Sequence, residues 1–166
     1  SAIIITAGFG ELGEEGRLMQ RRLNEISSEY GLRFLGPNCM GIINTEISLN
    51  TTVMPYLYPP GSLGFASQSG TYVTQTIPYL GKRGLSFSKA ISVGNSANID
   101  IIDALEYLGE DDQTRAISLY IEGLRDVPRF IEIARKITPR KPVLAQYVGG
   151  SGAGARSSLS HTGRSE

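Results

Sequence analysis

The chain has 166 residues, of which 40% are hydrophobic and 19% are charged, so its composition is globular and excludes a disordered protein. Lys and Arg together number 16, as do Asp and Glu, and this balance gives no reason to expect a nucleic-acid or membrane partner. With one cysteine, Cys39, and no apolar run long enough for a membrane span or a signal peptide, the sequence predicts a cytoplasmic protein.

The first third of the chain predicts a strand, a helix and a second strand at residues 2–6, 14–30 and 32–35. Gly31 is placed to end the helix. Between Asn44 and Gly61 the pattern is lost, and prolines in that stretch indicate a connector. We therefore expect a first domain over residues 1–52 and a second over 53–166.

The second half alternates strands and helices more regularly. Its predicted strands are residues 63–66, 86–93, 116–121 and 143–147, and its predicted helices are residues 71–81, 99–108 and 127–137. Asn98 and Asp126 are the expected N-caps of the last two helices. Helices between successive strands imply parallel pairing, and strands rich in Ile and Val indicate a sheet covered on both faces. The sequence therefore predicts a flavodoxin-like α/β sandwich. Because the chain begins within a strand and stops without a closing element, we expect it to be a segment of a longer protein.

Ligands of open parallel sheets bind at the carboxyl ends of the strands, where four loops of the second half converge. One of them, Ser69-Gly70-Thr71, leads from a strand directly into a helix, and the free N–H groups of such a helix start attract an anion. The simpler alternative is that these residues only cap the helix.

Two titratable residues occupy the same edge. Glu122 directly follows a strand, where a carboxylate must find a partner or protonate, unless it is simply a solvated strand end. His161 follows a glycine-rich run that can approach a phosphate closely. As a nucleophile it would attack with one ring nitrogen while a carboxylate held the other, but composition alone favours a surface histidine.

The segment Gly8-Phe9-Gly10-Glu11-Leu12-Gly13 matches the G-x-G-x-x-G pattern of dinucleotide-binding turns. That function also needs an acidic residue at the end of the next strand, and this strand ends in Leu35-Gly36-Pro37-Asn38. The fingerprint is incomplete, so the segment is interpreted as a glycine-rich turn between a strand and a helix.

Six segments together resemble the succinyl-CoA synthetase superfamily, and most closely its ADP-forming acetate–CoA ligases. They are Ile5-Thr6-Ala7-Gly8-Phe9 with Glu11, Gly36-Pro37-Asn38-Cys39 with Gly41, Ser67-Gln68-Ser69-Gly70, Ser92-Val93-Gly94-Asn95, Tyr120-Ile121-Glu122-Gly123 and Ser160-His161-Thr162-Gly163. Arg164 departs from the small residues that usually follow the last segment.

The resemblance implies that residues 1–52 are the C-terminal part of a Rossmann-like CoA-binding domain and that residues 53–166 are the flavodoxin-like ligase domain. It also implies the site residues: His161 as the phosphohistidine, Glu122 as its support, Ser69, Gly70 and Thr71 as the phosphate site, and Asn38 and Cys39 as neighbours of the CoA thioester. It implies no metal ligand in this chain.

The implied reaction converts acyl-CoA, phosphate and ADP reversibly into carboxylic acid, CoA and ATP. Coenzyme A, ADP or ATP and Mg²⁺ would take part, with the nucleotide and the metal on an ATP-grasp subunit or domain, in an oligomer that acts on a small carboxylic acid. The isolated segment would be inactive. Two alternatives stay open: a regulatory region of a protein lysine acetyltransferase, and a dinucleotide-dependent oxidoreductase based on Gly8–Gly13.

Overall fold

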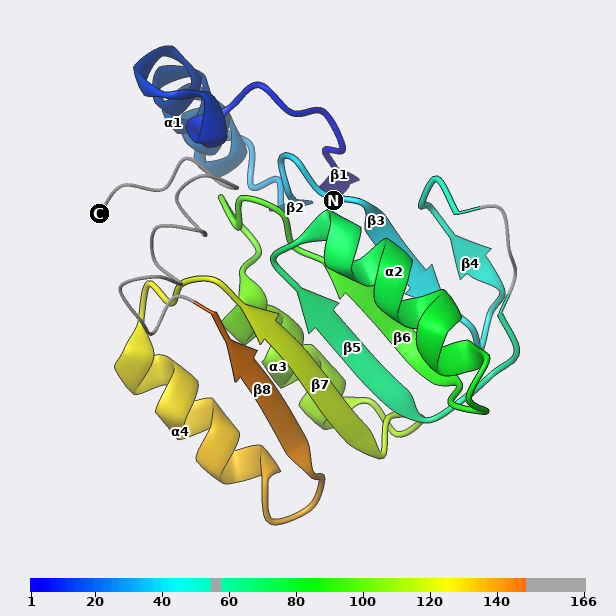
Figure 1. The fold of residues 1–166 in the computed structure, drawn as a ribbon. Helices are drawn as coiled ribbons and strands as arrows, with labels where there is room; N and C mark the ends of the chain where they lie inside the picture. Colours follow the sequence, from blue (N-terminus) through cyan, green and yellow to red (C-terminus); the bar gives the residue numbers. More distant parts are fainter. Residues whose placement is uncertain (55–57, 149–166) are drawn as a thin grey trace.

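The computed structural model describes residues 1–54 and 58–148 (Figure 1). Two short parallel strands, β1 (Ala2–Ile3) and β2 (Phe34–Leu35), pair in the first part of the chain. Between them lie the 3₁₀ helix η1 (Gly10–Leu12) and the helix α1 (Glu14–Glu29). The C-cap of α1 is Tyr30, and Gly31, the residue predicted to end the helix, follows it with a positive φ. The side chains of Met19 on α1 and of Tyr30 are exposed.

A six-stranded sheet forms the rest of the fold. Its order is β4-β3-β6-β5-β7-β8, with parallel pairing of β5 to β6, β5 to β7 and β7 to β8. The strands are β3 (Gly41–Asn44), β4 (Leu49–Asn50), β5 (Leu63–Ser67), β6 (Phe87–Ser92), β7 (Ala116–Ile121) and β8 (Val143–Tyr147). The predicted α/β class and the parallel pairing of the four predicted strands are confirmed.

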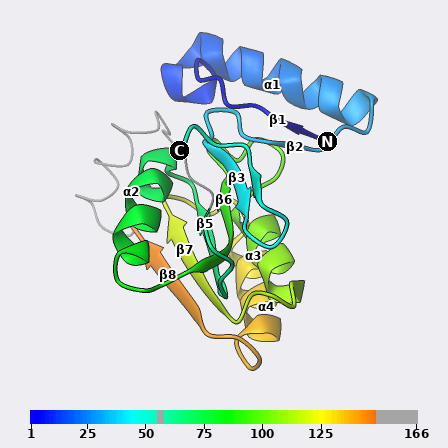
Figure 2. The same ribbon diagram turned by 90° about the vertical axis from the view of Figure 1, so that its right-hand side faces the viewer.

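Three helices cover the two faces of this sheet. They are α2 (Gly70–Gly81), α3 (Ile101–Glu110) and α4 (Val127–Ile137). Figure 2 shows α2 on one face and α3 and α4 on the other, while α1, β1 and β2 stack on one end of the sheet. The fold is therefore a three-layer sandwich with a small unit placed on its edge. Within residues 1–54 and 58–148, no helix has both the length and the hydropathy that a bilayer crossing requires.

The strands β3 and β4 were not predicted from the sequence. The strand β3 runs antiparallel to β6, and β4 pairs antiparallel with β3 at the edge of the sheet. A strand of four residues next to one of two residues is too short for an alternating pattern to emerge from the surrounding polar residues. Hydrogen bonding thus places residues 41–50 in the larger sheet, while the proposed domain division at residue 52 stays a prediction.

The caps of α3 and α4 explain where these helices begin. Asp126 accepts from the backbone N–H of Arg129, as predicted for α4. The predicted cap of α3 is wrong: Asp100, not Asn98, accepts from the first turn of that helix and forms a capping box with Asp103. Asn98 instead accepts from the backbone N–H of Phe34 and donates to Ser27, so it joins the sandwich to the first part of the chain.

Each face of the sheet buries its own apolar cluster. The larger cluster lies under α3 and α4, and it includes the fully buried side chains Ile101, Ile102, Leu105, Leu108, Ile117, Leu119 and Ile121. The smaller one lies under α2 and comprises Ile43, Met54, Phe65, Val73, Ile77, Phe87 and Ala90. Burial of these side chains is the main force that fixes the helices on the sheet.

A buried ion pair lies among the polar residues near the amino ends of the parallel strands. Lys89 of β6 has a side chain that is 4% exposed, and its Nζ lies 2.7 Å from Oδ1 of Asp111 and 3.4 Å from Oε2 of Glu46. Burial raises the pKa of Asp111, but hydrogen bonds from Lys89 and Thr114 and the charge of Lys89 outweigh it, so this pKa lies below its ordinary value. The Asp111 carboxylate is therefore stabilised in the folded state.

Replacing Asp111 with Asn is expected to destabilise the fold by about 2 kcal/mol at pH 7, because Lys89 then keeps only the half-exposed Glu46 as a counter-charge. A carboxyl whose pKa is lower in the folded state stabilises the protein above its unfolded-state pKa of about 3.9, and this contribution is lost as the pH falls through the folded-state pKa. The difference between the variant and the wild type should therefore shrink below about pH 4. Denaturant unfolding at several pH values measures it, with Asp112→Asn as the exposed neighbouring control.

Candidate functional site

The carboxyl ends of β5, β6 and β7 meet at one edge of the sheet, and the chain after each strand carries the predicted site residues. Ser69, Gly70 and Thr71 follow β5, Asn95 follows β6, and Glu122 follows β7. The backbone N–H of Val93 donates to Ser67, and that of Gln68 donates to Tyr120, so the three loops start side by side. The structure therefore brings Ser69, Gly70, Thr71 and Glu122 to one edge, while His161, which the sequence assigned to the same edge, lies outside the described residues.

The helix α2 starts at this edge with unpaired donors. The hydroxyl of Ser69 caps the helix by accepting from the backbone N–H of Tyr72 at 3.3 Å. In the part of the chain that the structure describes, no group accepts from the backbone N–H of Gly70 or Thr71. A helix of 12 residues with free N–H groups at its start can hold an anion such as a phosphoryl group. The capping role and the anion-binding role are thus compatible in one segment.

Glu122 is 6% exposed, and its backbone is held by the side chain of Gln68. Oε1 of Gln68 accepts from the backbone N–H of Glu122 at 2.6 Å and from that of Gly123 at 3.0 Å, and Nε2 donates to the carbonyl of Gly123 at 2.9 Å. These bonds continue the pairing of β5 with β7 beyond the last paired residues. The position of the Glu122 backbone is therefore fixed independently of its own carboxylate.

Aromatic rings flank the same edge. The rings of Tyr72 and Tyr120 stack with centroids 4.1 Å apart, and the hydroxyl of Tyr72 donates to Oε1 of Gln146 on β8 at 2.6 Å. Burial raises the pKa of Tyr120, and electrostatic interaction with Glu122 and Tyr72 raises it further. Tyr120 therefore stays a neutral phenol beside the Glu122 carboxyl group at neutral pH.

The segment Asn38-Cys39-Met40 lies against the start of α2. A Cβ on Gly70 would lie 2.5 Å from Cγ of Met40, so any other residue at position 70 would displace the Met40 side chain. The backbone N–H of Met40 donates to the hydroxyl of Ser92 at the end of β6. Gly94, which has a φ of 54°, passes so close to the carbonyls of Pro37 and Asn38 that a Cβ there would overlap both. The structure thus places Asn38 and Cys39 at the same edge as the phosphate-binding candidates.

Cys39 is buried, and its Sγ donates to the carbonyl of Ile4 at 3.4 Å. Burial raises the pKa of the Cys39 thiol above its ordinary value. The thiol is therefore protonated at neutral pH and is not a nucleophile. Its contacts explain how it packs the first part of the chain on the sandwich, and its predicted proximity to a thioester stays a prediction.

The turn at Gly8–Gly13 is closed by its own side chains. Oε1 of Glu11 accepts from the backbone N–H of Gly8 at 2.5 Å and of Phe9 at 3.2 Å, and Oε1 of Gln20 accepts from that of Gly10 at 3.3 Å. A pyrophosphate in a dinucleotide site would need such N–H groups, which an internal carboxylate already occupies here. This geometry adds a physical reason against the oxidoreductase alternative.

Two of the residues that organise this edge were not assigned by the sequence. Gln68 and Asn95 lay within the family-like segments, but an amide side chain carries no periodicity and pairs with any backbone group. The only signal available was their position directly after predicted strands. His161 and the glycine-rich run before it lie outside the described residues.

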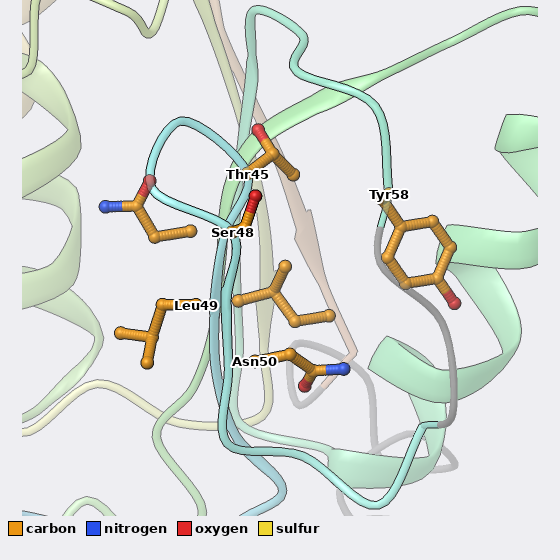
Figure 3. Close-up of a pocket in the computed structure, with 7 residues that line it drawn as sticks. Thr45, Ser48, Leu49, Asn50 and Tyr58 are labelled. Carbon is orange, nitrogen blue, oxygen red and sulfur yellow. The ribbon is translucent and has the colours of Figure 1, made fainter.

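Figure 3 shows a pocket between the β3–β4 hairpin and Tyr58. Its lining residues are Ile43, Asn44, Thr45, Ser48, Leu49, Asn50 and Tyr58. Asn44 pairs with Lys89 near the start of β6, so the pocket lies toward the amino ends of the parallel strands. It does not belong to the candidate site.

A mostly parallel sheet sandwiched by helices, with an anion-suited helix start and a buried carboxyl group at its carboxyl edge, defines a flavodoxin-like α/β domain. Residues 60–166 match the family model described as the succinyl-CoA ligase like flavodoxin domain, and the chain belongs to this family. The resemblance drawn from the sequence is thereby confirmed.

Two proteins similar to this chain are named as ADP-forming acetate–CoA ligases. It is 48% identical to the alpha subunit of acetate–CoA ligase [ADP-forming] II of Pyrococcus furiosus, over 97% of this chain and 35% of the relative. It is 42% identical to acetate–CoA ligase [ADP-forming] I of Archaeoglobus fulgidus, over 98% of this chain and 24% of the relative. Among solved structures, acetyl-coenzyme A synthetase 1 of Ca. Korarchaeum cryptofilum in complex with phosphate and ADP is similar, with a TM-score of 0.91 and 33% identity over 98% of this chain and 35% of that one.

The chain thus spans about a third of the length of two of these proteins and about a quarter of the other. Their names support the ligase interpretation over the acetyltransferase alternative.

Proposed function

We propose that this chain is the phosphohistidine-carrying region of an ADP-forming acyl-CoA synthetase, which converts acyl-CoA, phosphate and ADP reversibly into carboxylic acid, CoA and ATP. The observation that carries the proposal is the juxtaposition, at one sheet edge, of the free N–H groups of Gly70 and Thr71 with the buried Glu122. The relatives named as ADP-forming ligases support the same activity.

The reaction is proposed to run in three balanced steps. Phosphate attacks the thioester carbon, the C–S bond breaks, and an acyl phosphate and CoA are formed. A ring nitrogen of His161 then takes the phosphoryl group and releases the carboxylate. Finally, ADP attacks the phosphorus, the P–N bond breaks, and ATP and neutral His161 are regenerated.

In this scheme the residues of the chain hold charge and orientation. The N–H groups at Gly70 and Thr71, with the hydroxyls of Ser69 and Thr71, bind the phosphoryl oxygens. Glu122 holds the second nitrogen of His161, which fixes the tautomer and stabilises the cationic ring that forms when phosphorus is attacked. Asn38 and Cys39 lie on the side of the thioester.

The nucleotide and Mg²⁺ are assigned to an ATP-grasp subunit or domain outside this chain, in an oligomeric assembly. Within residues 1–54 and 58–148, no group of three or more His, Cys, Asp or Glu side chains has a geometry that could hold a metal ion. Relatives named as alpha subunits support a partner subunit, and their names as acetate–CoA ligases support a small carboxylic acid as the substrate.

The proposal is tested by incubating the complete assembly with [γ-³²P]ATP and Mg²⁺. The expected product is a phosphoprotein whose label is lost in acid, survives alkali and is discharged by ADP, as a P–N bond requires. Adding the carboxylic acid and CoA should also discharge the label and yield acyl-CoA. Label that survives acid would place the phosphate on a hydroxyl or show a different chemistry, and transfer of the acyl group to lysine would favour the acetyltransferase alternative.

A further inference from the structure

Four polar side chains form a continuous hydrogen-bonded chain between the first part of the molecule and the sandwich. Nδ2 of Asn95 donates to Oε2 of Glu11 at 2.5 Å and to Oε1 of Gln20 at 3.0 Å, and Oδ1 of Asn95 accepts from Nδ2 of Asn38 at 3.3 Å. We call these four residues, Glu11, Gln20, Asn95 and Asn38, the amide relay. It joins residues that are 84 and 57 positions apart in the sequence.

The relay has a defined direction because its first members can only accept. The Glu11 carboxylate already accepts from the N–H groups of Gly8 and Phe9, and Oε1 of Gln20 accepts from the N–H of Gly10. The atom of Asn95 that faces both acceptors must therefore be its NH₂ group. This leaves the oxygen of Asn95 facing Asn38, so the atom of Asn38 on that side must be its NH₂ group.

The consequence is that the oxygen of Asn38 lies on the far side of its amide from Asn95. Among the residues that the structure describes, no group donates to this Oδ1, and Asn38 is only half-buried. Asn38 has a φ of 56°, its backbone N–H donates to the carbonyl of Thr6 at 3.0 Å, and the neighbouring carbonyl of Pro37 accepts from the backbone N–H of Asn95 at 2.9 Å. The backbone of Asn38 is thus held by backbone bonds and its amide by the relay, with one acceptor left over.

The negative charge of Glu11 keeps the donor–acceptor direction of the relay fixed. Burial raises the pKa of Glu11, but hydrogen bonds from Asn95 and from the N–H groups of Gly8 and Phe9 outweigh it, so the pKa lies below its ordinary value. The carboxylate therefore stays ionised across the neutral range, and an ionised carboxylate is acceptor-only.

We propose that Glu11 and Asn95 are positioning residues that hold the Asn38 oxygen as a hydrogen-bond acceptor for a donor on the pantetheine arm of coenzyme A. The inference rests on the proposed function, which places Asn38 beside the thioester. Three kinds of group on that arm can donate: its two amide N–H groups, the hydroxyl of its pantoate unit and the terminal thiol. Through Asn38, the turn at Gly8–Glu11 would thus affect the recognition of CoA although the turn itself does not contact CoA.

The decisive variants exchange carboxylate and amide side chains, which changes donors into acceptors in the relay but keeps the size of each side chain. In Glu11→Gln, the oxygen must still serve Gly8 and Phe9, so the new NH₂ group faces the NH₂ group of Asn95. If the amide of Asn95 flips, its oxygen faces Oε1 of Gln20 and its NH₂ group faces the NH₂ group of Asn38, so neither of these two contacts is a hydrogen bond. In the double variant Glu11→Gln with Asn95→Asp, the carboxylate at position 95 accepts from the amide at position 11 and from the NH₂ group of Asn38, so the orientation of Asn38 is restored. The contact with Oε1 of Gln20 is not restored, because two acceptors then face each other.

Isothermal titration of the full-length protein, assembled with its partner, measures the Kd of CoA. Glu11→Gln is expected to weaken CoA binding about tenfold, because one buried donor is left opposed to another. The double variant should recover most of that loss, while the KM values for phosphate and ADP stay unchanged in both. Glu14→Gln, an exposed glutamate at the start of α1, is the matched control and should bind like the wild type.

The same titrations with desulfo-CoA identify the donor. An equal loss in Glu11→Gln assigns it to an amide or the hydroxyl of the arm, and no loss assigns it to the thiol. Unchanged CoA binding in Glu11→Gln, or a double variant at least as weak as the single one, would overturn the inference. A wild-type protein that does not bind CoA would instead overturn the proposed function, so the two failures are distinguishable. Melting curves of each variant separate loss of fold from loss of orientation.

Discussion

Substituting Asn for His161 is expected to abolish the acid-labile phosphorylation of the assembled enzyme by ATP. Asn has a similar polar outline, but its amide nitrogen has no lone pair that can attack phosphorus. The phosphoryl group then has no covalent acceptor, and loss of a covalent nucleophile typically lowers kcat by about 10⁴-fold or more. Both half-reactions should be lost together, because the scheme routes acyl phosphate and ATP through one nitrogen.

The measurement combines labelling with peptide mapping. Residues 1–166 contain a single histidine, so a phosphohistidine mapped to this stretch can only be His161. CoA binding by His161→Asn should match that of the wild type, which serves as the control for folding. Retained acid-labile label in the variant would assign the phosphate to a histidine elsewhere in the full protein.

Replacing Glu122 with Gln is expected to lower the rate of phosphoryl transfer by about 10³-fold, because the ring of His161 loses the negative charge that stabilises its cationic form. The substitution keeps the size of the side chain. It also keeps the loop in place, because Gln68 holds the backbone of Glu122 and Gly123 rather than the carboxylate. The loss should therefore fall on kcat, with the affinity for CoA unchanged.

Rapid-quench measurement of label transfer from ATP to the enzyme, and from the enzyme to ADP, resolves this effect from product release. Glu29→Gln, an exposed glutamate on α1, is the matched control and should transfer phosphate at the wild-type rate. Should Glu122→Gln lose CoA binding while its transfer rate stays normal, Glu122 would belong to the CoA site and not to the histidine.

The amino-acid sequence by itself determined most of the secondary structure in the second half. The predicted ranges for β7, β8 and α4 agree with the structure at both ends, because long apolar runs and helical spacing are local signals. The edge of the sheet at which β5, β6 and β7 end also followed from local order, since parallel strands must place their carboxyl ends together. The predicted site residues Ser69, Gly70, Thr71 and Glu122 could therefore be assigned to one edge before any coordinates were known.

The tertiary structure alone decided how that edge is held. The clamp of Gln68 on Glu122 joins residues 54 positions apart, and the bond from Asn95 to Glu11 joins residues 84 positions apart. The antiparallel strand β3 and the cap at Asp100 belong to the same class of features. The physical reason is that an amide or a carboxylate can satisfy its hydrogen bonds with almost any polar group, so its partner is selected only when packing brings one within about 3 Å.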